Sequence, residues 1–178
     1  MNPSLPRTPL AQSPDFSERD FRHALGQFAT GVTVVTARGP EGSLVGVTVS
    51  SFNSVSLHPP LVLWSMGRSS AALPAFEHCR HYAVQVLSAQ QLGLARQFAS
   101  RGVDRFAGVP YRFNAHGVPL LDGVLASFEC CNRSRYAEGD HTIFVGEVEH
   151  CSHRTDLAPL LYHGGHLHAE HALAASGG

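Results

Sequence analysis

A cluster of hydroxyl and amide side chains between two apolar runs is the part of the sequence best suited to bind a ligand. Residues 44–49 are an apolar run, and residues 61–64 are a second one. The cluster between them consists of Thr48, Ser50, Ser51, Asn53 and Ser54. Together with the N–H groups of a turning backbone, such side chains can surround an anion such as a phosphate. The alternative is a polar bulge whose side chains satisfy their own backbone.

A cation for this anion is available shortly after the second apolar run. Arg68 and Ser69 precede a short helix expected over residues 71–78, whose Pro74 is tolerable only in the first turn. A helix N-terminus offers unpaired N–H groups and a positive dipole, and a serine can cap it. The alternative is a solvated surface arginine beside an ordinary serine cap.

Cysteine and histidine residues do not predict a metal site. Cys79, Cys130, Cys131 and Cys151 show no C-x-x-C spacing, and we expect them to be buried reduced thiols, with Cys130 and Cys131 on opposite faces of a strand. Four of the twelve histidines gather near the C-terminus, at His163, His166, His168 and His171. Zinc requires ligands on a rigid frame, whereas we expect the Gly-rich segment from Gly164 onward to fray.

Composition indicates one folded domain. The chain has 178 residues, 43% of them hydrophobic and 15% charged, with a net charge of −1. This balance argues against nucleic-acid binding, and no apolar stretch approaches the roughly 20 residues of a membrane helix. Residues 1–15 are expected to be a flexible tail without a signal peptide, residues 16–168 the domain, and residues 169–178 a second flexible tail. A cytoplasmic location follows as an expectation.

Hydrophobic periodicity predicts a mainly β domain with a few short helices. A capping box at residues 17–20 begins a helix that should end near Gly31, and a second helix covers residues 90–98. Expected strands cover 32–37, 44–49, 61–64, 82–87, 124–136, 141–150 and 160–163. Tight turns at residues 39–42 and 137–140 join two pairs of them. A barrel is favoured because closure removes exposed strand edges.

Three blocks of sequence together resemble a known family. Residues 28–36, 46–65 and 138–141 are similar to the flavin reductase family, which includes the reductase partners of two-component flavin monooxygenases. The resemblance covers about residues 16–168. It implies an antiparallel, Greek-key-like FMN-binding split barrel.

The resemblance also implies roles for particular residues. Thr48, Val49 and Ser50 match positions along the flavin ring, and Ser51 and Asn53 match the neighbourhood of the ribityl chain and phosphate. The segment 98–106 resembles a loop in which many members have Asp-Lys-Phe. Here Arg105 replaces the lysine before Phe106, which keeps the charge but alters its geometry.

His141 matches a family histidine beside the flavin on the nicotinamide side. It is expected to position NADH or NADPH, since hydride transfer requires near-attack stacking and no acid–base residue. No catalytic residue is therefore assigned with certainty. Taken alone, His141 would be an idle, solvated turn residue. Leu167 stands where an aromatic residue is frequent in the family.

The implied function is hydride transfer from NAD(P)H to FMN or FAD, supplying reduced flavin to a partner monooxygenase. The sequence contains no G-x-G-x-x-G motif, so the nicotinamide nucleotide would dock on the flavin with few contacts of its own. One alternative is a non-catalytic FMN-binding or electron-carrier protein. Another, an oxidase of the pyridoxamine-phosphate type, fits less well. A homodimer is expected, with Val55, Leu57 and Trp64 near the interface, although Trp64 can equally be a core residue.

Overall fold

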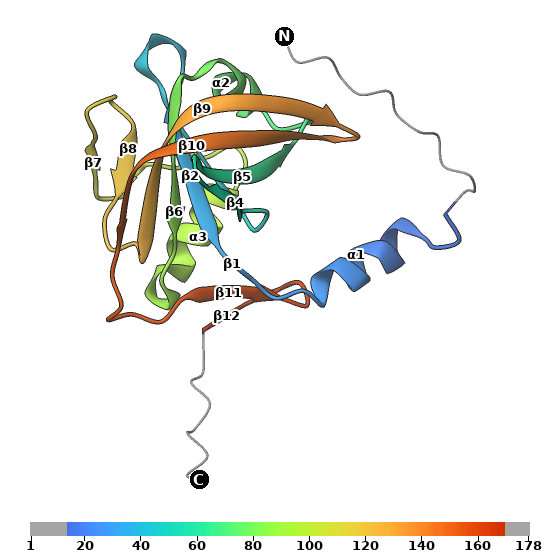
Figure 1. Ribbon diagram of the computed structural model, residues 1–178. Coiled ribbons are helices and arrows are strands. Elements are labelled where there is room, and N and C mark those ends of the chain that lie inside the picture. The colour runs from blue at the N-terminus through green and yellow to red at the C-terminus, as the bar shows by residue number, and fades with distance from the viewer. Residues whose placement is uncertain (1–13, 170–178) are drawn as a thin grey trace.

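A strongly curved antiparallel sheet forms the centre of the computed structural model, which describes residues 14–169 (Figure 1). Seven strands form it in the order β3-β2-β6-β9-β10-β5-β4. Their bounds are β2 Thr33–Arg38, β3 Leu44–Val49, β4 Asn53–Leu57, β5 Pro60–Gly67, β6 His81–Val86, β9 Ala126–Glu138 and β10 His141–His153. The mainly β, antiparallel prediction is confirmed.

Smaller elements cover the ends and one side of this barrel. A three-stranded sheet pairs β1 Thr30–Gly31, β11 Leu160–His163 and β12 His166–Ala169, and a hairpin pairs β7 Tyr111–Phe113 with β8 Pro119–Leu121. The helices are α1 Glu18–Gly26, α2 Leu73–His78 and α3 Leu92–Ala99, with short 3₁₀ turns η1 Pro40–Gly42 and η2 Ala89–Gln91. None of the described helices is long and apolar enough to cross a membrane.

The barrel interior is filled by aromatic side chains. Trp64 on β5 is fully buried and stacks on Phe144 of β10, with ring centroids 4.5 Å apart, while Phe76 of α2 meets Trp64 edge-on at 5.1 Å. The alternation of buried residues along β5 directs Trp64 inward. Trp64 is therefore a core residue of the single chain, and the expectation that it flanks an interface is wrong.

A second apolar cluster closes the other side of β2. Val34, Leu87, Phe98, Leu121 and Leu160 are buried together in it. All of β2 except its last residue is buried, since its two faces contact the two clusters. This arrangement fixes α3 against the sheet beside β3.

Strands β3 and β5 approach each other but do not form a ladder of their own. Ser51, two residues after β3, bridges the gap. Its Oγ accepts a hydrogen bond from the Ser65 N–H at 3.0 Å and donates one to the Ser65 carbonyl at 2.9 Å. This single side chain thus closes the barrel between the two strands.

Helix α1 begins at the predicted capping box but ends early. Ser17 Oγ accepts a hydrogen bond from the Asp20 N–H at 3.1 Å, and the Asp20 carboxylate accepts one from the Ser17 N–H at 3.3 Å. The helix ends at Gly26 because residues 30–31 pair with β11 instead. No residue of α1 is buried, and the helix projects from the barrel (Figure 1).

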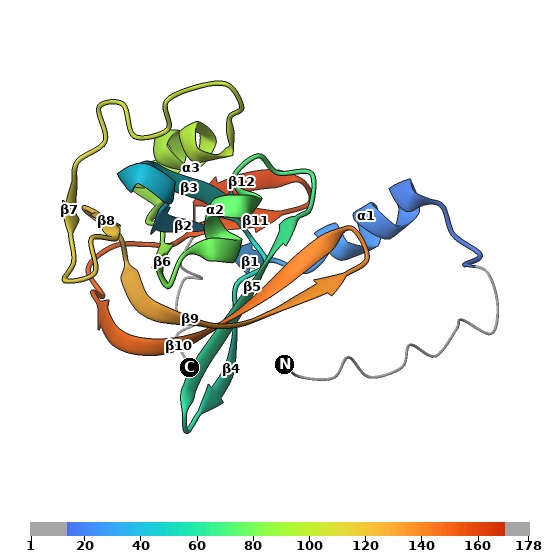
Figure 2. The same cartoon turned by 90° about the horizontal axis from the view of Figure 1, so that it is seen from above.

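Three segments differ from the expectation. Residues 53–57 form the edge strand β4, whose hairpin with β5 projects from the barrel in Figure 2. Residues 166–169 form β12 and pair with β11, so the segment after Gly164 does not fray at once. The predicted loop after α3 contains the β7–β8 hairpin near its end. In each case the conformation depends on pairing with another strand, which cannot be predicted from the propensities of the segment itself.

The cysteines meet the expectation only in part. Cys79 and Cys130 are buried, and Cys131 faces the other side of β9 and is half-buried, so the two neighbours do point to opposite faces. Cys151 is exposed, which contradicts the prediction that all four thiols are buried. It lies on the outer end of β10, where the strand no longer covers the barrel interior.

Candidate functional site

An open cleft of about 880 Å³ lies along β3. Five segments form its walls: β3 with the residues after it, the end of β5, the turn before α2, the loop after α3, and the start of β10. The predicted residues in its lining are Thr48, Val49, Ser50, Ser51, Ser69, Arg105, Phe106 and His141. The structure therefore brings together most of the proposed cofactor residues from four separate segments. The cleft's volume falls in the usual range for a small-molecule site.

Several hydroxyl groups of the cleft are engaged by the protein itself. Thr48 Oγ1 donates to the Ala95 carbonyl of α3 at 2.7 Å, and Ser51 Oγ is bound to Ser65. Ser50 is exposed, and no described residue hydrogen-bonds its hydroxyl. Ser50 is thus the hydroxyl of β3 that is available to a ligand, whereas Thr48 and Ser51 shape the wall.

Phe98 of α3 reaches β3 beneath this wall because Gly46 lacks a side chain. A Cβ at Gly46 would lie 2.4 Å from the Phe98 ring, closer than real contacts allow. Phe98 in turn meets Phe106 edge-on, with centroids 5.0 Å apart. Gly46 therefore sets the spacing between β3, α3 and the loop that carries Phe106.

The two arginines of the loop after α3 have different surroundings. Arg105 is half-buried and donates from Nη1 to the Gly46 carbonyl at 2.6 Å and from Nε to the Ser100 carbonyl at 2.9 Å. Burial lowers the pKa of its guanidinium, which nevertheless keeps its proton at neutral pH. Arg105 consequently fastens the loop to β3 through one of its donors and to the end of α3 through another.

Arg101 is the free cation of the cleft. It lines the cleft, is exposed, and makes no ion pair or hydrogen bond with any described residue. The resemblance to the family pointed to Arg105, four positions later, and not to Arg101. A left-handed turn at Gly102 (φ 72°) separates the two, and no local signal tells which guanidinium will point to the cleft.

Asn53 and Arg68 lie outside the cleft. Asn53 begins β4, is exposed, and accepts the N–H of Ser54 at 2.8 Å through its side-chain oxygen. Arg68 is exposed, and its backbone N–H donates to the Asp140 carbonyl at 2.8 Å. Neither is among the residues that line the cleft.

The turn before α2 supplies a further hydroxyl pair. Ser70, which the sequence also suggests as a helix cap able to reach an anion, lines the cleft and accepts the Ala72 N–H at 3.3 Å. Ser69 is exposed, and its hydroxyl has no partner among the described residues. Ser69, Ser50 and Arg101 are therefore among the unengaged donors of the cleft.

His141 enters the cleft from the start of β10. Its Nδ1 lies 2.6 Å from Asp140 Oδ1. This hydrogen bond, together with the imidazole charge, holds the pKa of the Asp140 carboxyl below its usual value. The carboxylate therefore keeps the proton on Nδ1 and leaves Nε2 for the cleft, close to Gly67, where a Cβ would lie 3.9 Å from it. His141 is half-exposed and can turn Nε2 to a ligand.

The cleft combines a flat β wall, free hydroxyl donors, one unpaired guanidinium and a carboxylate-oriented imidazole. These groups fit a ligand with a planar ring and an anionic end, as a flavin phosphate has. An antiparallel β barrel with such an open, polar cleft is typical of a flavin-binding protein. The chain belongs to the flavin reductase family, since the model for the flavin reductase like domain matches residues 25–171.

Named relatives agree with this assignment. The chain is 51% identical over 149 residues to the FMN reductase (NADH) SmoA of Agrobacterium fabrum, and the match covers 84% of each chain. Among solved structures, the NADH:FAD oxidoreductase SgcE6 of Streptomyces globisporus, in complex with NAD and FAD fragments, superposes with a TM-score of 0.81 at 38% identity. That match covers 93% of this chain and 99% of SgcE6.

A third similarity is to a flavin reductase that serves a monooxygenase. The styrene monooxygenase flavin reductase SMOB of Pseudomonas putida S12 superposes with a TM-score of 0.79 at 32% identity, covering 87% of this chain and 99% of SMOB. The resemblance to reductases of two-component monooxygenases is thereby confirmed at the level of the family.

Proposed function

We propose that this protein transfers a hydride from NADH or NADPH to FMN or FAD. The nicotinamide loses two electrons and one proton as hydride, and the flavin takes up that hydride and one proton from solvent. The flavin supplies the electron-accepting ring when bound. The observation that carries this proposal is the cleft itself, where Ser50, Ser69, Arg101 and His141 present free polar groups from four segments.

These residues divide into two groups by what they can bind. Ser50, Ser69 and Arg101 suit the anionic end of the flavin, because hydroxyl and guanidinium groups donate to phosphate. Val49 and Phe106 line the cleft with apolar surface for the ring. Thr48, Ser51 and Arg105 hold the wall and the loop in place through their backbone partners.

His141 would orient the nicotinamide nucleotide. Its Nε2 can bind the amide or pyrophosphate oxygens of the dinucleotide, while Asp140 fixes the ring through Nδ1. With no dedicated dinucleotide motif in the chain, we expect weak and displaceable binding of both substrates. Such binding suits a reductase that releases reduced flavin to a separate monooxygenase. We propose a cytoplasmic location, where both flavin and nicotinamide nucleotide are available.

The decisive assay mixes the purified protein with NADH and free FMN under air and follows NADH absorbance. Oxidation that requires both protein and flavin supports the reductase. Tight FMN binding without NADH or NADPH oxidation would instead identify a non-catalytic flavin carrier. Repeating the assay with FAD and NADPH assigns the preferred pair of substrates.

We further propose that the protein is a homodimer. Exposed apolar side chains lie along α1 and its flanks and on β4; they are Phe16, Phe21, Leu25, Phe28, Val55 and Leu57. Leu57 is 81% exposed and Phe28 73%, which is unusual for a chain that functions alone in water. Covering them with a second copy would bury on the order of 2,000 Å² or more in an obligate dimer.

Sedimentation velocity at micromolar concentration tests the assembly. We expect a dimer for the natural chain and a shift toward monomer for Phe21→Ser with Leu25→Ser. Arg19→Ser, on the same helix but outside the apolar set, is the matched control. A stable monomer of the natural chain would contradict the proposal.

A further inference from the structure

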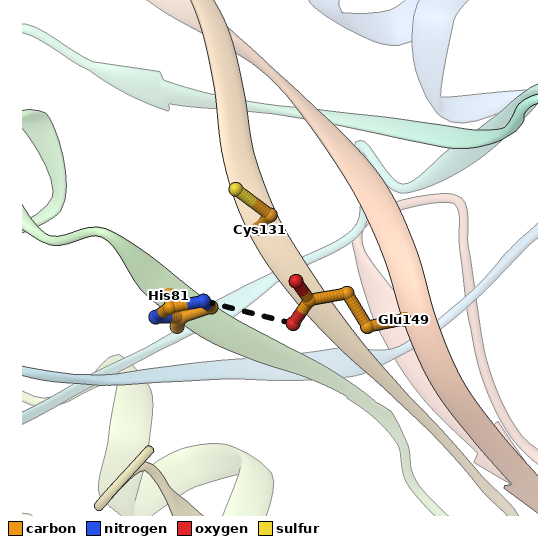
Figure 3. A group of neighbouring side chains, drawn as sticks. All are labelled: His81, Cys131 and Glu149. Atoms are coloured by element: carbon orange, nitrogen blue, oxygen red, sulfur yellow. Dashed lines mark ion pairs between the residues drawn. The ribbon is translucent and has the colours of Figure 1, made fainter.

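A group of three potential metal ligands, with a histidine beside it, lies away from the cleft. His81 of β6, Cys131 of β9 and Glu149 of β10 converge from neighbouring strands, as Figure 3 shows, and their ligand atoms all lie within 4.8 Å of one another. His116, from the turn between β7 and β8, joins them with Nε2 3.5 Å from Glu149 Oε2. None of the four lines the cleft.

The register of the sheet explains why three of them meet. His81 is the direct partner of Cys131 across β6 and β9, so their side chains share a face. On β10, Val148 pairs with Cys130 and His150 with Glu129. Glu149 is therefore the extra residue of a β-bulge. Bulges re-aim a side chain, and here the bulge turns the Glu149 carboxylate toward His81.

The neighbouring His116 is held in place by its own turn. Asn114 accepts the N–H groups of His116 and Val118 through Oδ1, both at 2.9 Å. Its Nδ2 donates to Glu129 Oε2 on β9 at 2.7 Å. Asn114 thus fixes the turn over β9, and the His116 ring stacks on the His81 ring with centroids 3.7 Å apart.

The Glu149 carboxylate faces both imidazoles. Its Oε2 lies 3.6 Å from His81 Nε2 and 3.5 Å from His116 Nε2. The separation from His81 exceeds a hydrogen bond but suits two atoms that share one cation. The His116 ring is parallel to the His81 ring, at 5°, so the lone pairs of both rings cannot point at one ion, and His116 packs beside the site.

We propose that His81, Cys131 and Glu149 form a binding site for a divalent transition metal of the zinc type, with water as the fourth ligand. An imidazole, a thiolate and a carboxylate are ligands that zinc accepts. Bonds of about 2.0–2.3 Å in a tetrahedron place ligand atoms roughly 3.3–3.7 Å apart, which matches the 3.6 Å between His81 Nε2 and Glu149 Oε2. On binding, the Cys131 thiol releases its proton to solvent.

Such a metal would join elements that are distant in sequence. It would link β6, β9 and β10 through one residue of each strand. We therefore expect bound metal to stabilise this part of the barrel and to raise the melting temperature of the protein. Because the site lies outside the cleft, metal should not compete with flavin.

Cobalt titration of the full chain, purified without a polyhistidine tag and kept reduced, tests the site. Co²⁺ bound to a thiolate gives a charge-transfer band in the near ultraviolet and d–d bands in the red. We expect both bands to saturate at one Co²⁺ per chain, and Zn²⁺ to displace them. Absence of the charge-transfer band, or a stoichiometry unaffected by the variants below, would overturn the proposal.

Matched variants separate this site from other thiols and histidines. Cys131→Ser should abolish the charge-transfer band and weaken Zn²⁺ binding at least tenfold, whereas Cys151→Ser should leave both unchanged. Glu149→Gln should weaken Zn²⁺ binding but keep the band. His166→Ala with His168→Ala removes the tail histidines and should have no effect; loss of the band in this variant would place the metal on the tail and refute the proposal.

Circular dichroism verifies that each variant is folded, and the melting temperature with and without Zn²⁺ gives a second readout. We expect Zn²⁺ to raise the melting temperature of the natural chain and of Cys151→Ser, and not of Cys131→Ser. Flavin affinity should be the same with and without Zn²⁺. Mutual exclusion of zinc and flavin would contradict a site separate from the cleft.

Discussion

Ser51 binds both backbone groups of Ser65, accepting its N–H at 3.0 Å and donating to its carbonyl at 2.9 Å. The hydroxyl thereby replaces a missing rung between β3 and β5. We expect Ser51→Ala to lower the free energy of unfolding by roughly 1–3 kcal/mol, since two hydrogen bonds of about 0.5–1.5 kcal/mol each are lost. Urea unfolding measures this change.

Ser50→Ala is the matched control for this substitution. Its hydroxyl has no partner among the described residues, so stability should stay within about 0.5 kcal/mol. Flavin affinity should nevertheless fall, because this hydroxyl faces the cleft. An unchanged stability in Ser51→Ala would show that the barrel does not depend on this bridge.

Arg101 and Arg105 should respond differently to substitution. Arg101→Ala removes a free cation, and we expect flavin affinity to fall roughly tenfold to a hundredfold, as for the loss of a charged hydrogen bond. The loss should diminish at high salt. Arg105→Ala should mainly destabilise the chain by freeing the loop from the Gly46 carbonyl. Flavin titration and urea unfolding of both variants measure these effects. A loss of stability in Arg101→Ala and a loss of flavin affinity alone in Arg105→Ala would contradict the prediction.

His141→Ala should raise KM for NADH with little change in kcat, because positioning contributes equally to ground state and transition state. Asp140→Asn should give a smaller change in the same direction, since it removes the charge that orients the ring. His150→Ala, at an exposed position of the same strand, is the control. A collapse of kcat with a new limb in the pH profile would instead identify His141 as a proton donor.

Gly46→Ala tests the close approach of α3 to β3. The added Cβ would meet the Phe98 ring at 2.4 Å, so we expect a loss of about 1–3 kcal/mol in the free energy of unfolding. Gly93→Ala, within α3 and with open space around it, should instead stabilise the chain by about 0.5–1 kcal/mol. Equal stabilities for the two variants would show that Phe98 can move aside freely.

Alkaline pH should destabilise the fold through its buried thiols. Burial raises the pKa of Cys79 to about 11 and that of Cys130 to about 12. The folded state thus favours the neutral thiols, and their contribution is complete below the unfolded pKa of 9.0 and is lost as pH rises through the folded values. Burial also raises the pKa of Tyr82, which acts in the same direction.

Urea unfolding at about pH 8 and about pH 10.5 measures this loss. Cys79→Ala with Cys130→Ala should reduce the pH dependence and leave the part due to Tyr82. The exposed Cys151→Ala is the control and should retain the full dependence. A double variant with an unchanged slope would contradict the assignment to these thiols.

Local signals predicted the elements that local chemistry decides. The capping box at Ser17 and Asp20 and the turn at Gly139 are fixed by neighbours within a few residues. Periodicity likewise revealed β9 and β10, because long alternating runs leave few alternatives. The family resemblance supplied the barrel topology, which these patterns alone would not select.

The orientation of side chains in the site was less accessible. Asn53 lies only two residues after Ser51, yet it belongs to the edge strand β4 and is not among the residues that line the cleft. The choice between Arg101 and Arg105 depends on the path of a loop that the Gly46 carbonyl fixes from β3. The cluster around Glu149 unites four distant segments through a bulge, for which sequence spacing holds no signal.

The uncovered helix α1 has a consequence for how the chain becomes ordered. It spans nine residues and buries none of them, and isolated helices of fewer than about 12–15 residues are marginal in water. Its capping box alone offers too little to offset the lost chain entropy. Helix formation at residues 18–26 should therefore be coupled to association. Amide hydrogen exchange in this segment should slow with rising protein concentration, while exchange in β2 stays constant.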